Sequence, residues 1–241
     1  MLATCYGRTR RSVSFAGVLL ILVSMPSVLL TGCTSVKVLL ARRPHVKDVA
    51  EALQILRESQ DPAARIAAYQ FLADAGNYPE RRVPEDIVVT LSEAWKTEPE
   101  PVSRMQALLA LRRIEHDRTR QAFLDALGDP DPLVRQTTCD VLGALALPDA
   151  VPALAERLSS DVSVDVRLAA ANALRRIGTS EAAEALYRSL ADADPAVRLR
   201  CRQLLADLVG EDHGSDLMAW QQAIRQAEFR PGQEKRRWWP F

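Results

Sequence analysis

The chain has 241 residues with equal numbers of basic and acidic side chains, 31 of each, so its formal net charge at neutral pH is zero. It lacks the positive excess with which proteins displace counterions from nucleic acid, and we therefore expect no nucleic-acid partner. The length and the share of apolar residues, 48% of the chain, suffice to bury a long continuous core.

The N-terminus combines a basic head with an apolar run. Three arginines, the last of them Arg11, precede an apolar stretch from Phe15 to Leu30. This order predicts a secretory signal peptide over residues 1–32. Pro26 interrupts the stretch, and a membrane-spanning helix needs about 20 apolar residues, so we do not expect a permanent span. Loss of residues 1–32 removes three arginines and no acid, which leaves 28 basic and 31 acidic residues.

The apolar stretch ends in Leu30-Thr31-Gly32-Cys33, which resembles a bacterial lipobox. The resemblance implies that the sulfur of Cys33 receives a diacylglycerol, that the chain is cut before it, and that the new amino group is acylated. Residues 33–45 would then form a lipidated tether. Thr34, which is not aspartate, favours the periplasmic face of the outer membrane over the inner membrane. A buried cysteine after an uncleaved helix is the alternative, and the general and twin-arginine export routes both stay open.

Residues 46–212 carry five copies of one short phrase, in which an acidic or small residue precedes an arginine by four positions and a leucine follows seven positions after it. Four phrases have a proline after their first residue. Successive arginines are 39, 31, 32 and 31 residues apart. A period in this range predicts a solenoid of stacked repeats. The arginines are Arg65, Arg104, Arg135, Arg167 and Arg198, and the leucines are Leu72, Leu111, Leu142, Leu174 and Leu205.

Each phrase reads as the start of a helix. A small residue stands three positions after the arginine, and its spacing to the leucine places both on one face of an α-helix. A second amphipathic segment precedes every phrase, so each repeat is a helix pair and the fold is all-α. Aspartate followed by proline suits the N-cap and the first turn of the second helix. Gly76 and Gly178 suit left-handed helix ends.

Helix pairs with this spacing resemble the HEAT repeat, in the short bacterial form first noted in phycobilisome lyases. The stretch from Val166 to Gly178 is close to a consensus unit, whereas the first two units are degenerate. The resemblance implies a ladder of hydrogen bonds between adjacent repeats, made by the five arginines with Asp61, Asp131 and Asp194. Ser163 takes the aspartate position in one repeat, where Asp161 or Asp165 could replace it. A row of ligand-binding arginines is the alternative.

Residues for catalysis or metal binding are scarce. The three histidines have no second ligand at metal spacing. Some HEAT-like hydroxylases hold two irons with His-Glu dipeptides, but the only neighbouring pair here is Glu115-His116, in reversed order. Cys139 and Cys201 read as buried structural thiols. We therefore predict no cofactor, no metal and no enzymatic activity.

The predicted function is an envelope scaffold that binds an unidentified protein partner. Its specificity should come from second-helix positions that the core does not dictate. Their mixed charge favours a protein over a polyanion. A structural protein that bridges membrane surfaces without a defined client is the alternative. The candidate partner surface comprises Gln70, Leu109, Arg113, Asp140, Asn172, Arg176 and Gln203.

The C-terminus adds two further segments. For residues 213–229 the pattern predicts a capping helix with Leu217, Trp220 and Ile224 on one face. Residues 230–241 form a basic and aromatic tail that suits a membrane interface. The tail could equally dock a partner, stay flexible, or fold its rings back on the solenoid. The candidate membrane contacts are Lys235, Arg236, Arg237, Trp238 and Trp239.

Overall fold

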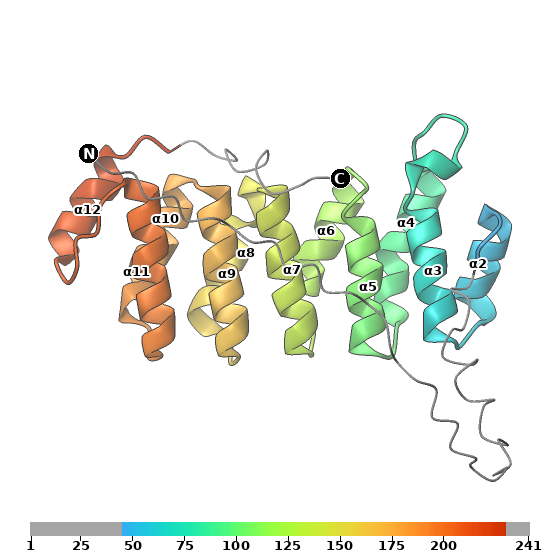
Figure 1. Cartoon of the computed structure of the whole chain (residues 1–241), viewed down its shortest axis with the longest axis horizontal. Helices are drawn as coiled ribbons and strands as arrows, with labels where there is room; N and C mark the ends of the chain where they lie inside the picture. Colours follow the sequence, from blue (N-terminus) through green and yellow to red (C-terminus); the bar gives the residue numbers. More distant parts are fainter. Residues whose placement is uncertain (1–44, 230–241) are drawn as a thin grey trace, which may run out of the picture. The chain divides into compact units, whose positions relative to one another are not determined.

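The computed structural model describes residues 45–229, and within this range every regular element is a helix. Ten α-helices form five successive pairs, and one further helix follows them (Figure 1). The predicted all-α solenoid with a C-terminal capping helix is confirmed. The pairs are α2 (Val49–Glu58) with α3 (Pro62–Leu72), α4 (Glu85–Ala94) with α5 (Pro101–Leu111), α6 (Asp117–Ala126) with α7 (Pro132–Leu145), α8 (Val151–Ser160) with α9 (Val164–Ile177), and α10 (Ser180–Arg188) with α11 (Pro195–Val209).

The second helices stand side by side in one row, α3, α5, α7, α9 and α11, with the first helices behind them (Figure 1). Four short 3-10 turns complete the regular structure of the described range. They are η1 (Ala75–Asn77), η2 (Trp95–Thr97), η3 (Pro148–Ala150) and η4 (Ser189–Ala191). None of the helices in residues 45–229 combines the length and the hydropathy that a bilayer crossing requires.

Local sequence explains where the second helices begin. Asp61, Asp131 and Asp194 are N-cap residues, and each side chain accepts a hydrogen bond from a backbone N–H two residues later. Proline follows each of them at the first turn, where its missing N–H leaves no intrahelical bond unmade. Ser163 caps α9 through its hydroxyl instead.

The leucine stripe forms the centre of the core. All five leucines of the repeated phrase are at most 1% exposed, and the small residue three positions after each arginine is fully buried. Small residues bring neighbouring second helices close, most clearly between α7 and α9. A Cβ added to Gly143 would lie 2.6 Å from the Cα of Ala173. Glycine is therefore required at this crossing because the backbone of α9 occupies the space.

Of the two glycines predicted to end helices in the left-handed conformation, one does so. Gly178 ends α9 in the left-handed conformation with φ 69°. Gly76 does not end α3. That helix ends at Leu72, and Gly76 lies in the 3-10 turn η1 that follows. The following loop is fixed to the stack by Tyr78, which is buried and donates its hydroxyl to the carbonyl of Leu72 at 3.0 Å.

The last helix, α12 (Leu217–Gln226), packs against α10. Trp220 is fully buried, and its indole N–H donates to the carbonyl of Gly214 at 3.2 Å. Ile224 is also buried. Leu217, predicted on the same face as Trp220 and Ile224, is 54% exposed. It is the first residue of the helix, before the turn that contacts the stack.

Several predicted features lie outside the described residues. They are the signal peptide over residues 1–32, the lipidation site Cys33 with most of the tether, and the tail with Lys235, Arg236, Arg237, Trp238 and Trp239. The boundaries at residues 46, 212 and 229 fall within or at the edge of the described range.

Candidate functional site

One arginine per repeat occupies the same place, in the first turn of the second helix. Its Nη1 donates to backbone carbonyls in the turn that joins the two helices of its own repeat. For Arg135 these are the carbonyls of Asp129 at 2.8 Å and Pro130 at 3.1 Å. This contact fixes the guanidinium against the turn of its own repeat. Nε and Nη2 then point toward the following repeat.

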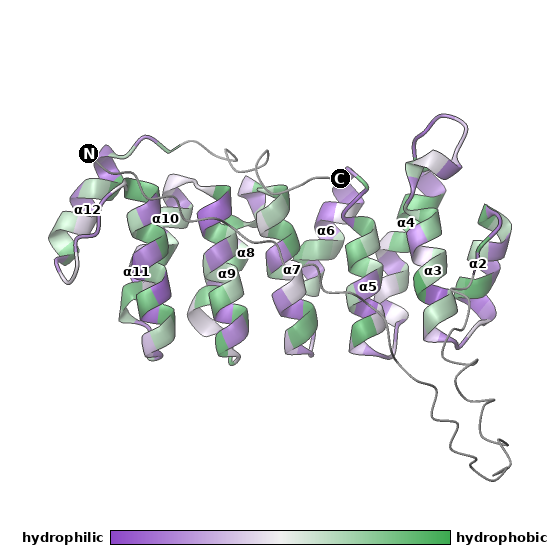
Figure 2. Ribbon diagram, in the orientation of Figure 1, coloured by the Kyte–Doolittle hydropathy of each residue, from purple (hydrophilic) through white to green (hydrophobic). Residues whose placement is uncertain are grey.

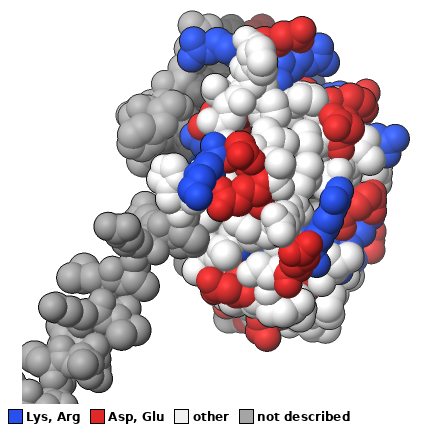
Figure 3. Space-filling view, turned by 90° about the vertical axis from the view of Figure 1, so that its right-hand side faces the viewer, with Lys and Arg blue, Asp and Glu red and all other residues white. Residues whose placement is uncertain are grey.

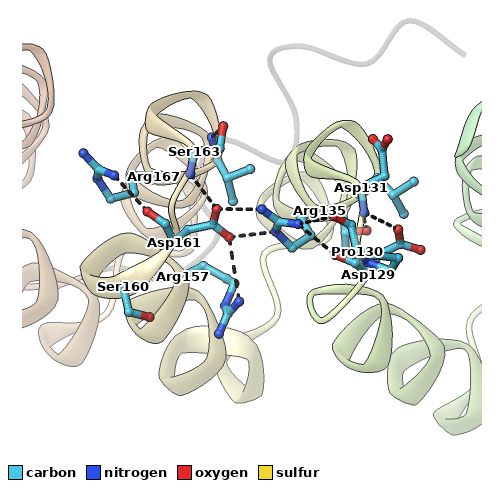
Figure 4. A network of polar contacts seen from close by, with 12 residues as sticks. Asp129, Pro130, Asp131, Arg135, Arg157, Ser160, Asp161, Ser163 and Arg167 are labelled. Carbon is cyan, nitrogen blue, oxygen red and sulfur yellow. Dashed lines mark hydrogen bonds and ion pairs between the residues drawn. The ribbon is translucent and has the colours of Figure 1, made fainter.

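Nε and Nη2 bind a carboxylate of the following repeat (Figure 4). Arg135 donates from both atoms to the two oxygens of Asp161, each at 2.8 Å. Arg104 does the same to Asp129, at 2.7 and 2.9 Å. Such bidentate, charge-assisted pairs are among the stronger polar contacts in proteins. They connect consecutive repeats in a ladder.

The two outer rungs are less regular. Arg65 donates from Nε to Glu98 Oε1 at 2.8 Å, and the hydroxyl of Tyr69 donates to the same oxygen at 2.6 Å. Burial, together with the neighbouring Glu98, raises the pKa of Tyr69 above its ordinary value. Arg167 donates from Nη2 to Asp192 at 3.3 Å, and its Nε lies 3.2 Å from the second oxygen without a well-directed hydrogen bond.

The partners of the arginines are not the aspartates that the resemblance implied. Asp61, Asp131 and Asp194 use their carboxylates to cap their own helices. The acid that joins the ladder stands two residues earlier in the chain and closes the turn by accepting the N–H of the cap residue. Asp161 has this role before Ser163, whereas Asp165 is exposed on α9.

Three ladder residues, Glu98, Asp129 and Asp192, were therefore missed by sequence reasoning. The signal that could have found them is an acid two positions before the N-cap residue in the second to fifth repeats. In the first repeat this position is Ser59, whose hydroxyl accepts the N–H of Asp61. A turn-closing side chain is thus present in the first repeat as well, but it is not a carboxylate.

The ladder carboxylates are almost fully buried, and each is paired with an arginine. Burial by itself would raise the pKa of Asp161, but hydrogen bonds from Arg135 and from the N–H of Ser163 hold it below its ordinary value. Arg157 adds a second cation, with Nη1 3.7 Å from the same carboxylate. It also lines a shallow depression over this rung, with Gly128 and the exposed Val162 at its edge.

The candidate partner surface is only partly available. The amide oxygen of Asn172 on α9 accepts two hydrogen bonds from Arg200 on α11, at 2.9 and 2.6 Å. Arg176 on α9 lies 3.9 Å from Asp140 on α7. Burial raises the pKa of Asp140, and Arg176 opposes this shift. Three of the predicted positions thus connect neighbouring second helices, while Gln70, Arg113 and Gln203 are exposed and Leu109 is half-buried.

His116 shows how the residues of the reversed pair are used. Its Nδ1 accepts the N–H of Arg118 at 3.0 Å and thereby caps α6. The neutral ring then carries its proton on Nε2, which lies 2.8 Å from Glu85 Oε2 on α4. Both ring nitrogens are engaged, so this histidine does not fit an iron ligand. Within residues 45–229, no group of three or more His, Cys, Asp and Glu side chains is arranged to hold a metal ion.

The two described cysteines are buried and unpaired. Burial raises the pKa of both thiols to about 12, so neither is a thiolate at neutral pH. Each is buried near the middle of a second helix, Cys139 on α7 and Cys201 on α11.

These observations define an α-solenoid of helix pairs joined by a polar ladder. Residues 120–206, which span most of α6 to α11, match the model of the HEAT repeat family. Over this region the helix pairs are therefore similar to HEAT repeats.

Comparison with known proteins shows that part of the chain is similar to an enzyme. The chain is 37% identical over 99 residues to deoxyhypusine hydroxylase-B of Oryza sativa subsp. japonica, a match that covers 40% of this chain and 32% of the relative. Human deoxyhypusine hydroxylase in complex with glycerol gives a TM-score of 0.48 at 23% identity, over 68% of this chain and 74% of that one. An engineered protein gives a TM-score of 0.42 at 18% identity, over 74% and 95%.

The prediction that the chain is not an enzyme is wrong, because the curated relative of its repeats is an enzyme. The predicted envelope scaffold and its alternative, a bridging structural protein, are wrong for the same reason. The repeat pattern contains no recognisable set of catalytic residues, but that absence does not exclude an activity. The chain spans about a third of the relative's length, so the activity of that enzyme enters below as a proposal.

Proposed function

We propose that this chain is a hydroxylase-related HEAT protein whose solenoid binds and positions a protein substrate for modification. The observation that carries the proposal is the 37% identity to deoxyhypusine hydroxylase-B over 99 residues. The irregular surface of the second helices supports it, because the ladder and core fix the repeats and leave the outward residues to vary.

The outward face of the second helices has the composition of a protein-binding surface. Val102 on α5, Leu133 on α7 and Leu199 on α11 are large apolar side chains that are 43–53% exposed. Apolar and polar residues alternate along these helices (Figure 2). On the side that carries α2, acidic and basic side chains are interspersed with uncharged ones (Figure 3). Exposed apolar side chains on helices that also carry polar residues suit a protein chain better than a polyanion.

The chemistry of the reaction is not assigned to residues of this chain. The donor set of the described repeats does not fit a two-iron centre, since His116 caps a helix and binds Glu85. No step is derived through such a centre. In the proposal, the solenoid supplies recognition and orientation of the substrate, which is the property that a row of rigid helices provides.

We propose further that the protein works at a bacterial membrane. The likeness of Leu30-Thr31-Gly32-Cys33 to a lipobox supports a lipid on Cys33, and Thr34 favours the periplasmic face of the outer membrane. Residues 34–45 reach about 40 Å at full extension, so the solenoid stays near its bilayer. The tail with Trp238 and Trp239 would give a second, weaker membrane contact. The spacing of the repeats supports the proposal that they are of the short bacterial HEAT form.

The function is tested by following a substrate. A photo-crosslinking residue placed at Leu133 first identifies the bound protein in the membrane fraction. The intact mass of that protein, purified without crosslinking, is then compared between cells that carry the natural chain, a variant chain or no chain. A chain-dependent mass gain, equal to one oxygen atom for a hydroxylation, is the expected result. It should disappear in Leu133→Glu and persist in Leu217→Glu, whose site is also exposed but lies on α12. A captured protein with one mass in both strains would overturn the proposal.

A further inference from the structure

The ladder contains five equivalent arginines but only four carboxylate partners within the described residues. Arg65, Arg104, Arg135 and Arg167 each bind an acid of the next repeat. Arg198, on the second helix of the last repeat, donates only to backbone carbonyls and has no acid within ion-pair distance anywhere in residues 45–229. The ladder is thus open at its C-terminal end.

The open position is built like the closed ones. Nη1 of Arg198 donates to the carbonyls of Asp192 at 2.8 Å and Ala193 at 2.9 Å. Arg135 makes the same two contacts to its own turn before it binds Asp161. The guanidinium of Arg198 is therefore held in the orientation that receives a carboxylate. Its Nε and Nη2, the two donors used in the rungs of Arg104 and Arg135, are unoccupied in the described structure.

The arrangement of the last helices explains the opening. In the inner repeats, the turn between the two helices of the next repeat covers the arginine and supplies the acid. In the described part of the chain α11 is followed by α12, which packs against the first helix α10. No further second helix follows α11 within the described range. Arg198 is exposed, and Leu199 beside it is 53% exposed.

We propose that Arg198 and Leu199 form a docking site for an acidic turn of a partner protein, with the partner's carboxylate bound bidentately by Nε and Nη2. The molecule itself shows what occupies this position, since acids of interhelical turns fill the four inner ones. A second copy does not provide it by continuing the stack, because its first repeat has Ser59 where the ladder acid would stand. The site goes beyond substrate binding and does not depend on it.

The test measures binding of a carboxylate to the guanidinium directly. Acetate is titrated into the full chain, and the arginine Nε–H signals are followed by NMR, with chloride at matched ionic strength as the blank. Arg225 is the matched control, because it is exposed on α12 and no carbonyl of residues 45–229 accepts a hydrogen bond from its side chain. The Arg198 signal should shift at a roughly tenfold lower acetate concentration than Arg225, since a fixed guanidinium loses less side-chain freedom on binding.

Three results would overturn the proposal. Equal responses of Arg198 and Arg225 would make Arg198 an ordinary surface arginine. A response to inorganic phosphate well below the acetate range would make the site a phosphate site. Insensitivity to acetate that is relieved by Glu234→Gln would show that the chain's own tail fills the position. The variant Arg198→Lys keeps the charge without the planar pair of donors, and the ammonium group that it introduces should respond no more strongly to acetate than those of the exposed natural lysines.

Discussion

The centre of the stack and its C-terminal end carry the same residue pattern, but their arginines make different contacts. Between α7 and α9, the rung of Arg135 and Asp161 is bidentate and buried, and Gly143 lets the helices touch. Toward the C-terminus, the Arg167 rung lengthens and Arg198 has no acid within the described range. The difference shows that an arginine of the ladder takes its energetic role from the repeat that follows it. Sequence identity of the phrase does not make the positions equivalent.

The largest effect is expected at the central rung. Asp161→Ala leaves the guanidinium of Arg135 buried without its carboxylate, which costs about 3–5 kcal/mol of unfolding free energy. Asp192→Ala should cost less, because its rung is longer and less well directed. Urea unfolding of both variants measures the difference. Equal losses at the two sites would contradict the gradient along the ladder.

The leucine stripe comes next. Leu174 is fully buried, and Leu174→Ala should lower the unfolding free energy by about 2–5 kcal/mol by leaving a cavity. Leu199→Ala is the control, because this leucine is 53% exposed and its loss should stay within about 0.5 kcal/mol. Thermal unfolding compares the two. A similar shift for both would mean that burial does not distinguish the positions.

The close helix crossing gives the third prediction. Gly143→Ala places a Cβ 2.6 Å from the backbone of Ala173, and the helices must separate at a cost of about 1–3 kcal/mol. In Gly128→Ala the nearest neighbour of the new Cβ is the carbonyl oxygen of Asp125 at 3.3 Å, so the substitution should be milder. If Gly143→Ala unfolds no more easily than Gly128→Ala, the α7–α9 crossing is looser than the structure shows.

Acid should weaken the centre of the stack. The pKa of Asp161 is held below its ordinary value in the folded protein, so the folded state keeps the carboxylate charged where the unfolded chain would protonate it. Its contribution to stability is complete above the unfolded pKa, about 3.9, and is lost as the pH falls through the lower folded value. Unfolding free energies measured across this acid range should fall more steeply for the natural chain than for Asp161→Asn.

The sequence was sufficient for the architecture because the pattern is local and repeated. Leucines at fixed distance from the arginine, proline after the cap residue and glycine at the end of α9 each act within one helix. The ladder partners depend on which acid of a turn points to the preceding repeat. The acid that caps the helix is already engaged, so the other acid of the turn binds the arginine. Asp131 satisfies the helix end, and Asp129 is left to reach Arg104. The link to an enzyme could not come from repeat periodicity, which fixes packing and carries no chemistry.

The smallest effect is expected where the ladder is open. Arg135→Gln leaves Asp161 buried with a single remaining cation, Arg157 at 3.7 Å, and should be strongly destabilising. Arg198→Gln removes an exposed guanidinium whose partners within residues 45–229 are two carbonyls of its own turn, so the loss should be within about 1 kcal/mol. Urea unfolding of the two variants tests the same side chain in two surroundings. A loss at Arg198 as large as at Arg135 would mean that the contacts to the turn, and not the carboxylate of the next repeat, provide most of the stabilisation.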